Sequence, residues 1–259
     1  MASRIASLAL VIVLVSIANN YGPAMANLTP NLPASSAKQV TIEIDFSKPI
    51  GRIRSLQQVH AGPIPKTKGA AQLHDQYRQI GVDYIRTHDG RPFFDIDVVF
   101  PNMQADPSNE SSYTFSSTDL QVEAIRSTGA EVFYRLGYTW GGPYSKTPPS
   151  DYAKFAEICK HIVMHYNHGW AKGFRYGIQY WEVWNEPDIG EFWTGTPAQY
   201  FTLYDVVAKA LKALGQDLKV GGPSLSGGPA FWNRGFLEDF LRFYKTNESR
   251  AQPLNFSVT

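Results

Sequence analysis

The sequence has little net charge and a single cysteine, and each shortage excludes a class of protein. Lysine and arginine total 24 and aspartate and glutamate 23, so the 259 residues carry a formal net charge of +1. No excess of one sign favours a nucleic-acid partner or an acidic membrane surface. Cys159 is the only cysteine, so no intrachain disulfide can form. Its place on the apolar side of a predicted helix indicates an inert core residue.

Two sequence motifs are also missing. No G-x-G-x-x-G turn follows any predicted strand, which argues against a dinucleotide cofactor. His161, His165 and His168 follow one flank of a predicted helix, but no H-E-x-x-H arrangement accompanies them. Although zinc sites use similar spacings, we expect these histidines to lie on a solvated helix face. We therefore predict no metal site.

The N-terminus has the pattern of a secretory signal. Arg4 supplies a positive start, residues 5–18 form an apolar run, and Ala24-Met25-Ala26 fits a cleavage site. The apolar run is shorter than the roughly 20 residues that span a bilayer. We expect residues 1–26 to be removed and the protein to be secreted, with no membrane association afterwards. The alternative is an uncleaved anchor.

The rest of the chain alternates between strand and helix patterns. We expect a linker at residues 27–39, an N-terminal β segment at 40–55 that includes "VTIEIDF", and one domain at 56–259. Strict alternation predicts a parallel sheet, either doubly wound or closed as a (β/α)8 barrel. Strands are predicted within 57–63, 82–90, 130–138, 178–186, 218–226 and 254–259, and helices within 69–81, 117–129, 149–167, 196–215 and 229–247.

Residues 179–193, "QYWEVWNEPDIGEFW", contain the strongest candidate for chemistry. Glu186 lies at the C-terminal end of the fourth predicted strand, the edge where parallel barrels form their active sites. The neighbouring rings of Trp184, Phe192 and Trp193 provide apolar surroundings that raise the pKa of a carboxyl group, as a general acid requires. The alternative is a solvated loop carboxylate.

Three stretches of the sequence resemble glycoside hydrolase family 39, the family of β-xylosidases and α-L-iduronidases. They are "WEVWNEPD", "VDYIRTHDG" and "LKVGGPSLSGG", and the resemblance covers roughly residues 40–259. It implies a (β/α)8 barrel that hydrolyses O-glycosidic bonds with retention, acting on an oligosaccharide, a polysaccharide or another glycoside. It also implies that Glu186 is the general acid/base, that Asn185 binds the sugar 2-hydroxyl and that His88 lines the sugar subsite. No cofactor is implied.

Three further side chains are expected at the same rim. His60 ends the first predicted strand, Trp140 follows the third, and Trp193 follows the fourth. Each could contact or stack on a sugar ring, and each could equally be a packing residue. What the three share is their predicted position, at the carboxyl edge of the sheet.

Glu182 shares strand parity with Glu186 and is expected to point into the barrel. A buried carboxylate needs a partner, and Arg86 and Arg135 on the two preceding strands are the candidates. We predict a Glu182–Arg86 pair that supports the site beneath Glu186. The alternative is a bulge that turns Glu182 outward.

A retaining glycosidase needs a second carboxylate, the nucleophile, about 5–5.5 Å from the acid/base. In the family that this sequence resembles, that residue is a glutamate at the end of the seventh strand, whereas the sequence reaches only the sixth. We therefore expect a barrel with about six βα units, incomplete at its C-terminus, together with one strand of an accessory β-sandwich. We expect this chain alone to be inactive and poorly soluble.

Two alternative functions stay open. One is a non-catalytic carbohydrate-binding protein, and the other is an endo-glycanase of the same clan. The sequence leaves the sugar, the choice between exo and endo action, and the oligomeric state undetermined.

Overall fold

A computed structural model describes residues 51, 57–60, 62–65, 73–88, 93–227, 234–245 and 256–258. The chain divides into two compact units, residues 1–52 and 53–259, and every helix and strand described here belongs to the second. The predicted signal peptide (1–26), the linker (27–39) and "VTIEIDF" lie outside the described residues. So do nearly all other residues of the 40–55 segment, and these assignments stay predictions.

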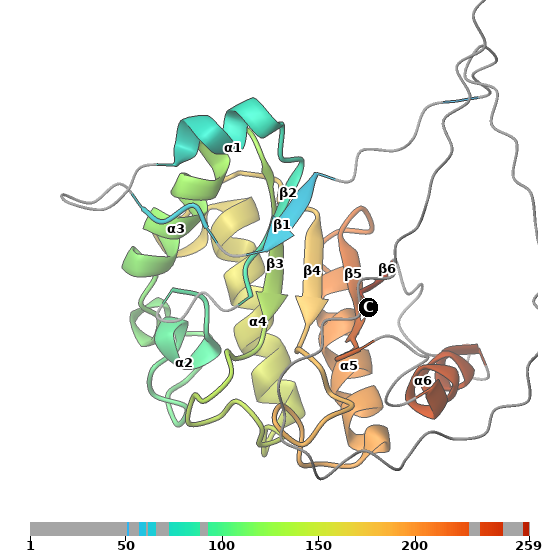
Figure 1. Ribbon diagram of the computed structural model, residues 1–259. Helices are drawn as coiled ribbons and strands as arrows, with labels where there is room; N and C mark the ends of the chain where they lie inside the picture. The colour runs from blue at the N-terminus through green and yellow to red at the C-terminus, as the bar shows by residue number, and fades with distance from the viewer. Residues whose placement is uncertain are drawn as a thin grey trace, which may run out of the picture. The chain divides into compact units, whose positions relative to one another are not determined.

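The second unit is built on a six-stranded parallel sheet (Figure 1). Neighbouring strands follow one another in sequence order from β1 to β6. A doubly wound sheet reverses its order at a switch point, and no reversal occurs among these strands. The succession is therefore that of a (β/α)8 barrel, as predicted. The strands are β1 (Gln58–His60), β2 (Tyr84–Arg86), β3 (Glu131–Leu136), β4 (Tyr180–Val183), β5 (Lys219–Ser224) and β6 (Phe256–Val258).

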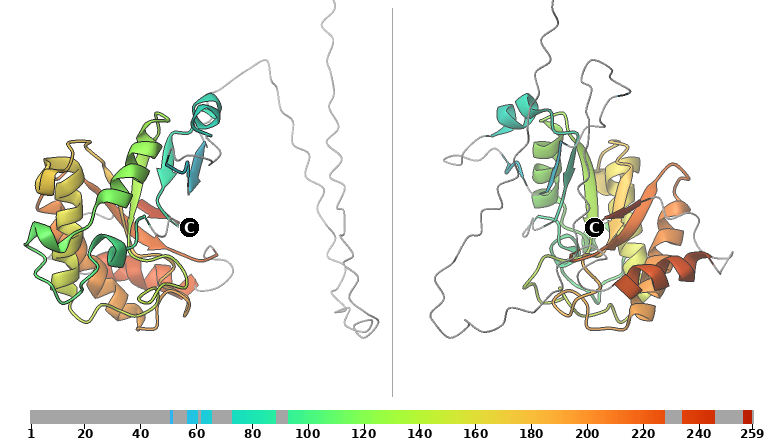
Figure 2. Two further views of the ribbon diagram at one scale, coloured as in Figure 1. Left: turned by 90° about the vertical axis from the view of Figure 1, so that its left-hand side faces the viewer. Right: turned by 45° about the vertical axis from the view of Figure 1, so that its right-hand side comes forward.

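Helices follow the strands at the predicted places. They are α1 (His74–Ile80), α3 (Ser116–Arg126), α4 (Tyr152–His168), α5 (Pro197–Lys212) and α6 (Arg234–Lys245). Figure 2 shows α3, α4 and α5 together on one face of the sheet. Three short helices were not predicted, because each holds too few residues to show a period: α2 (Ile96–Val99), η1 (Glu110–Ser112) and η2 (Trp170–Lys172).

Local sequence signals set the helix ends near the candidate site. The Thr196 hydroxyl accepts from the backbone N–H of Gln199, and the Gln199 side chain accepts from Thr196, which forms a capping box before Pro197. The Asp151 carboxylate caps α4 by accepting from the Lys154 backbone N–H at 2.9 Å. The loops that border the carboxyl edge of the sheet end at these two caps.

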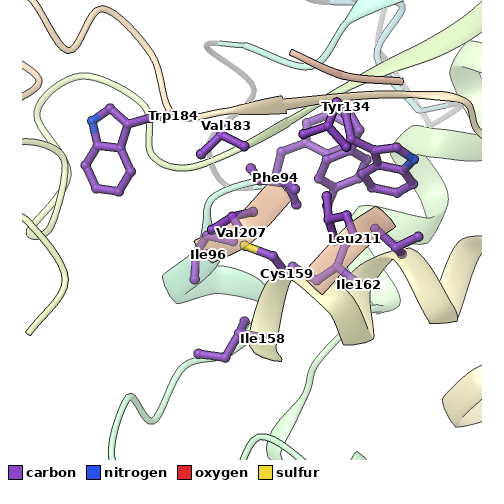
Figure 3. Packing of buried hydrophobic residues seen from close by; sticks show 14 of the residues in the cluster. Phe94, Ile96, Tyr134, Ile158, Cys159, Ile162, Val183, Trp184, Val207 and Leu211 are labelled. Atoms are coloured by element: carbon purple, nitrogen blue, oxygen red, sulfur yellow. The ribbon is translucent and has the colours of Figure 1, made fainter. Parts of the chain in front are cut away.

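The strand residues that face the helices form the hydrophobic core. Ile85, Tyr134, Trp181 and Val183 are fully buried and belong to one cluster with apolar residues of α4 and α5. Figure 3 shows Tyr134 and Val183 above Cys159 and Ile162 of α4. Cys159 lies within this cluster, and burial raises the pKa of its thiol above the usual range. It is therefore the inert core residue that the sequence predicted.

The opposite face of the sheet has a different character. Alternation along the strands places aromatic and charged residues there, and they include a candidate functional site. The residues are Tyr84 and Arg86 on β2, Phe133 and Arg135 on β3, Tyr180 and Glu182 on β4, and Lys219 on β5.

The expectation of a solvated histidine flank on α4 was wrong for two of the three residues. His161 and His165 are buried, and only His168 is exposed. The ring nitrogens of His165 lie 3.0 Å from Asp119 Oδ1 and 3.0 Å from the Trp170 carbonyl oxygen. The unpredicted η2 segment covers this flank, and sequence periodicity could not show that.

Candidate active site

Arg86 is the centre of a polar cluster at the carboxyl end of β2. Its Nε donates to Glu182 Oε2 at 2.9 Å, and one terminal nitrogen donates to the same oxygen at 2.5 Å. That nitrogen also donates to Asn185 Oδ1 at 2.8 Å and to Ser224 Oγ at 3.0 Å. One guanidinium group thus joins β2 to β4 and β5, and the predicted Glu182–Arg86 pair is present.

Glu182 is fully buried in this cluster, with a side chain 0% exposed. Burial raises the pKa of its carboxyl group, and the adjacent charges of Arg86 and then Arg135 oppose that rise. The other candidate partner, Arg135, forms its own buried pair with Asp95 at 3.0 Å. Two separate ion pairs are therefore buried here, Arg86–Glu182 between β2 and β4 and Arg135–Asp95 between β3 and the segment before α2.

Asn185 is held in one orientation. Its side-chain oxygen accepts from Arg86, and the residue is 1% exposed. Its side-chain nitrogen, Nδ2, has no hydrogen-bond partner among the described residues. A buried amide donor without a partner costs about 1–3 kcal/mol. This donor is therefore suited to a ligand hydroxyl group.

Glu186 lies in the turn after β4, whereas the sequence analysis placed it at the end of the strand. β4 ends at Val183, and Trp184 and Glu186 both have positive φ, 70° and 41°. The Glu186 backbone N–H donates to the Ser224 carbonyl oxygen at 2.7 Å, which fixes this turn against β5. Because non-glycine residues rarely adopt positive φ, two such residues in three mark a strained segment of the kind common at functional sites.

His88 is buried two residues beyond Arg86. Burial, followed by the positive charges of Arg135 and Arg86, lowers the pKa of His88 to about 2. The imidazole is therefore neutral at ordinary pH. Its ring centre lies 6.4 Å from that of His60, which is exposed at the end of β1, and 5.8 Å from that of Phe192. Both histidines lie at the predicted edge, and their role in sugar binding stays a prediction.

The depressed pKa of His88 predicts a specific loss of stability in acid. Below pH 6.5 the unfolded chain takes up a proton on this histidine and the folded chain does not, so folding becomes less favourable as the pH falls. Between pH 7 and pH 5 this amounts to about 2 kcal/mol. Urea unfolding measures this. Between pH 7 and pH 5, the free energy of unfolding of His88→Asn should fall by about 2 kcal/mol less than that of wild type. His168→Asn, at an exposed position, should match wild type, and equal losses in all three proteins would contradict the assignment.

The two tryptophans predicted at the rim have opposite surroundings. Trp193 is 4% exposed, and its Nε1 donates to the Thr196 carbonyl oxygen at 3.0 Å. Its ring packs between Trp184 and Tyr200, which favours the packing alternative over stacking on a sugar. Trp140 is 68% exposed, which leaves its ring available to a ligand, and its role stays a prediction.

The structure reveals partners that the sequence did not indicate. Ser224 is bound to Arg86, and its position on β5 carried no signal of that role. Asp188 accepts from the Ser226 backbone N–H at 3.1 Å and from its hydroxyl at 2.9 Å, which joins the loops after β4 and β5. Strand parity places Arg135 on the inner face of the sheet. It cannot place Asp95, which lies after β2 and before α2, so the Asp95–Arg135 pair was not predicted.

No group of three or more histidine, cysteine, aspartate or glutamate side chains in the described part of the chain is placed to hold a metal ion. None of the helices that the structure describes is long and apolar enough to cross a membrane.

The sequence and the fold match known proteins. The pattern of glycosyl hydrolases family 39 matches residues 40–256. A β-xylosidase of Geobacillus stearothermophilus is 32% identical over 197 residues, which are 69% of this chain and 36% of that protein. A β-xylosidase of Caldicellulosiruptor saccharolyticus is 27% identical over 206 residues, or 72% and 41%.

Two solved structures have the same arrangement of strands and helices. The crystal structure of a glucosidase from Croceicoccus marinus matches with a TM-score of 0.66 and 32% identity, over 81% of this chain and 44% of that one. The family 39 enzyme from Xanthomonas axonopodis pv. citri matches with a TM-score of 0.53 and 25% identity, over 72% and 36%. This chain thus spans less than half the length of each of these four relatives. Since the family pattern extends over most of its residues, the chain belongs to glycosyl hydrolases family 39.

Proposed function

We propose that the protein hydrolyses β-xylosides or closely related glycosides with retention, and that Glu186 is its general acid/base. The observation that carries the proposal is the arrangement of Arg86, Asn185 and Glu186. Arg86 fixes the oxygen of Asn185, which leaves the buried Nδ2 donor without a partner next to the Glu186 turn. Two neighbours named β-xylosidases share this region of sequence and support the substrate class.

The proposed residues act in two steps. Glu186 first protonates the glycosidic oxygen as the bond to the leaving group breaks, and it then removes a proton from the water that releases the sugar. Asn185 Nδ2 donates to the sugar 2-hydroxyl, an interaction that strengthens in the oxocarbenium-like transition state. His88, neutral at working pH, lines the same edge without adding charge.

We propose that the nucleophile lies outside this chain, on a further strand of the barrel. The acids near this edge of the described sheet already have other partners. Glu182 binds Arg86, Asp95 binds Arg135, and Asp188 binds Ser226, while Glu191 is exposed. The N-terminal signal pattern supports the further proposal that the protein is secreted.

Hydrolysis of 4-nitrophenyl β-xyloside tests this proposal. Purified residues 1–259 should release no nitrophenol above background. A longer product of the same gene that does hydrolyse the substrate should release xylose first as the β-anomer. Proton NMR distinguishes the two anomers. Glu186-dependent turnover by residues 1–259 would refute the assignment of the nucleophile. Sugar binding without turnover in every form would favour a carbohydrate-binding protein instead.

A further inference from the structure

The loop between β3 and α4, residues 137–151, presents two large aromatic rings to solvent. Trp140 is 68% exposed and Tyr144 is 42% exposed. Burying a side chain of this size typically stabilises a protein by about 1.5–3 kcal/mol, and neither ring obtains that gain in full. Two exposed rings in one short loop indicate a contact surface.

A cavity of about 220 Å³ lies beside Tyr144. Met103, Tyr138 and Phe155 supply apolar surface, and the ring centre of Tyr138 lies 5.9 Å from that of Tyr144. Polar groups also line the cavity, from Gln104, Ser150, Asp151 and Lys154. Asp151 is fixed by its capping bond to the Lys154 backbone, so the start of α4 forms a defined part of this wall.

The chemistry of these walls suits one sugar ring. A pyranose presents apolar C–H faces and a rim of hydroxyl groups, each of which both donates and accepts. The Tyr144 ring offers an apolar face, and the Gln104 amide offers both a donor and an acceptor. Lys154 adds a donor to hydroxyl oxygens. The volume is below the roughly 300–1,000 Å³ of sites that hold larger ligands, which favours a single ring.

The cavity lies near the Glu186 turn but does not include it. The Tyr138 ring packs edge to face against Trp184, with centres 5.3 Å apart, two residues before Glu186. The backbone N–H and the hydroxyl of Thr194 donate to the Lys146 carbonyl oxygen at 2.8 and 3.0 Å, which joins the loops after β3 and β4. None of the residues of the Arg86 cluster lines the cavity.

We propose that this cavity binds one sugar residue of an oligosaccharide, away from the bond that Glu186 cleaves. The substrate class rests on the proposed function, whereas the location rests on the Tyr144 ring, the polar residues and the volume of the cavity. The protein would then favour oligosaccharides over small aryl glycosides, because only a longer ligand reaches both places.

Titration with xylohexaose tests the proposal in protein carrying Glu186→Gln, in which hydrolysis of a sugar leaving group is slowed. We expect Tyr144→Ala to weaken xylohexaose binding at least tenfold by calorimetry, and Tyr144→Phe, which keeps the ring, to stay within threefold. Leu120→Ala, at an exposed position on α3, is the matched control and should bind as the parent does. Because Tyr144 and Leu120 are exposed, these substitutions should leave folding intact.

Methionine methyl groups report the location directly. Met103 lines the cavity and Met164 lies farther along α4, so carbon-13 methyl spectra should show xylohexaose shifting Met103 and not Met164. Unchanged affinity in Tyr144→Ala, an unshifted Met103, or no xylohexaose binding at all would each overturn the cavity assignment. Tyr144-dependent binding in a protein that never hydrolyses xylosides would refute the proposed function and leave the cavity assignment standing.

Discussion

Glu182→Ala is expected to lower the free energy of unfolding by about 3–5 kcal/mol, the usual cost of removing one partner from a buried ion pair. The Glu182 side chain is fully buried and that of Arg86 is only 17% exposed, so the substitution leaves a desolvated guanidinium without its carboxylate. It also removes the two hydrogen bonds from Arg86 to Glu182, which help to orient the guanidinium toward Asn185 and Ser224. Urea unfolding at pH 7 measures the loss.

Glu131→Ala provides the matched control. Glu131 lies on β3, is largely exposed, and approaches Arg126 only to 3.9 Å. Its removal should cost less than about 1 kcal/mol, as for other surface pairs. Combining Glu182→Leu with Arg86→Met should recover much of the lost stability, because no charge is then left buried alone. If Glu182→Ala costs no more than Glu131→Ala, the pair does not support the site.

Glu186→Gln is expected to reduce kcat/KM by about 10²–10⁴-fold for a β-xyloside with a poor leaving group, such as methyl β-xyloside. A glutamine cannot supply the proton that an alkoxide needs on departure. The dinitrophenyl glycoside needs little protonation, so its first step should be nearly unaffected. The assay uses the shortest expressed form of the protein that hydrolyses xylosides.

An added anion separates this role from a structural one. Azide should restore turnover of the dinitrophenyl substrate in Glu186→Gln, because it attacks the glycosyl intermediate without base assistance. Glu191→Gln, an exposed acid five residues later, should change kcat/KM less than twofold. Equal losses on both leaving groups with no rescue by azide would show that Glu186 is not the acid/base.

Strand parity predicted the central contact of the candidate site. Alternation along "YWEV" placed Glu182 on the inner face, and the need to neutralise a buried carboxylate left Arg86 and Arg135 as candidate partners, of which Arg86 is the one observed. The same argument could not extend to Glu186, because positive φ at Trp184 and at Glu186 interrupts alternation after Val183. Parity holds only while the backbone remains extended.

The sequence by itself determined the succession of strands and helices, the burial of Cys159, and several residues of the candidate site, among them Arg86, Glu182 and Glu186. Each of these follows from periodicity, capping residues or charge within a few consecutive positions. The tertiary structure alone decided that Trp193 packs in the core, that η2 covers His165, and that Ser224 completes the Arg86 cluster. Those outcomes depend on which distant segment of the chain covers a side chain. A local sequence pattern shows only whether one face of a helix or strand is apolar or polar, and not which segment packs against that face.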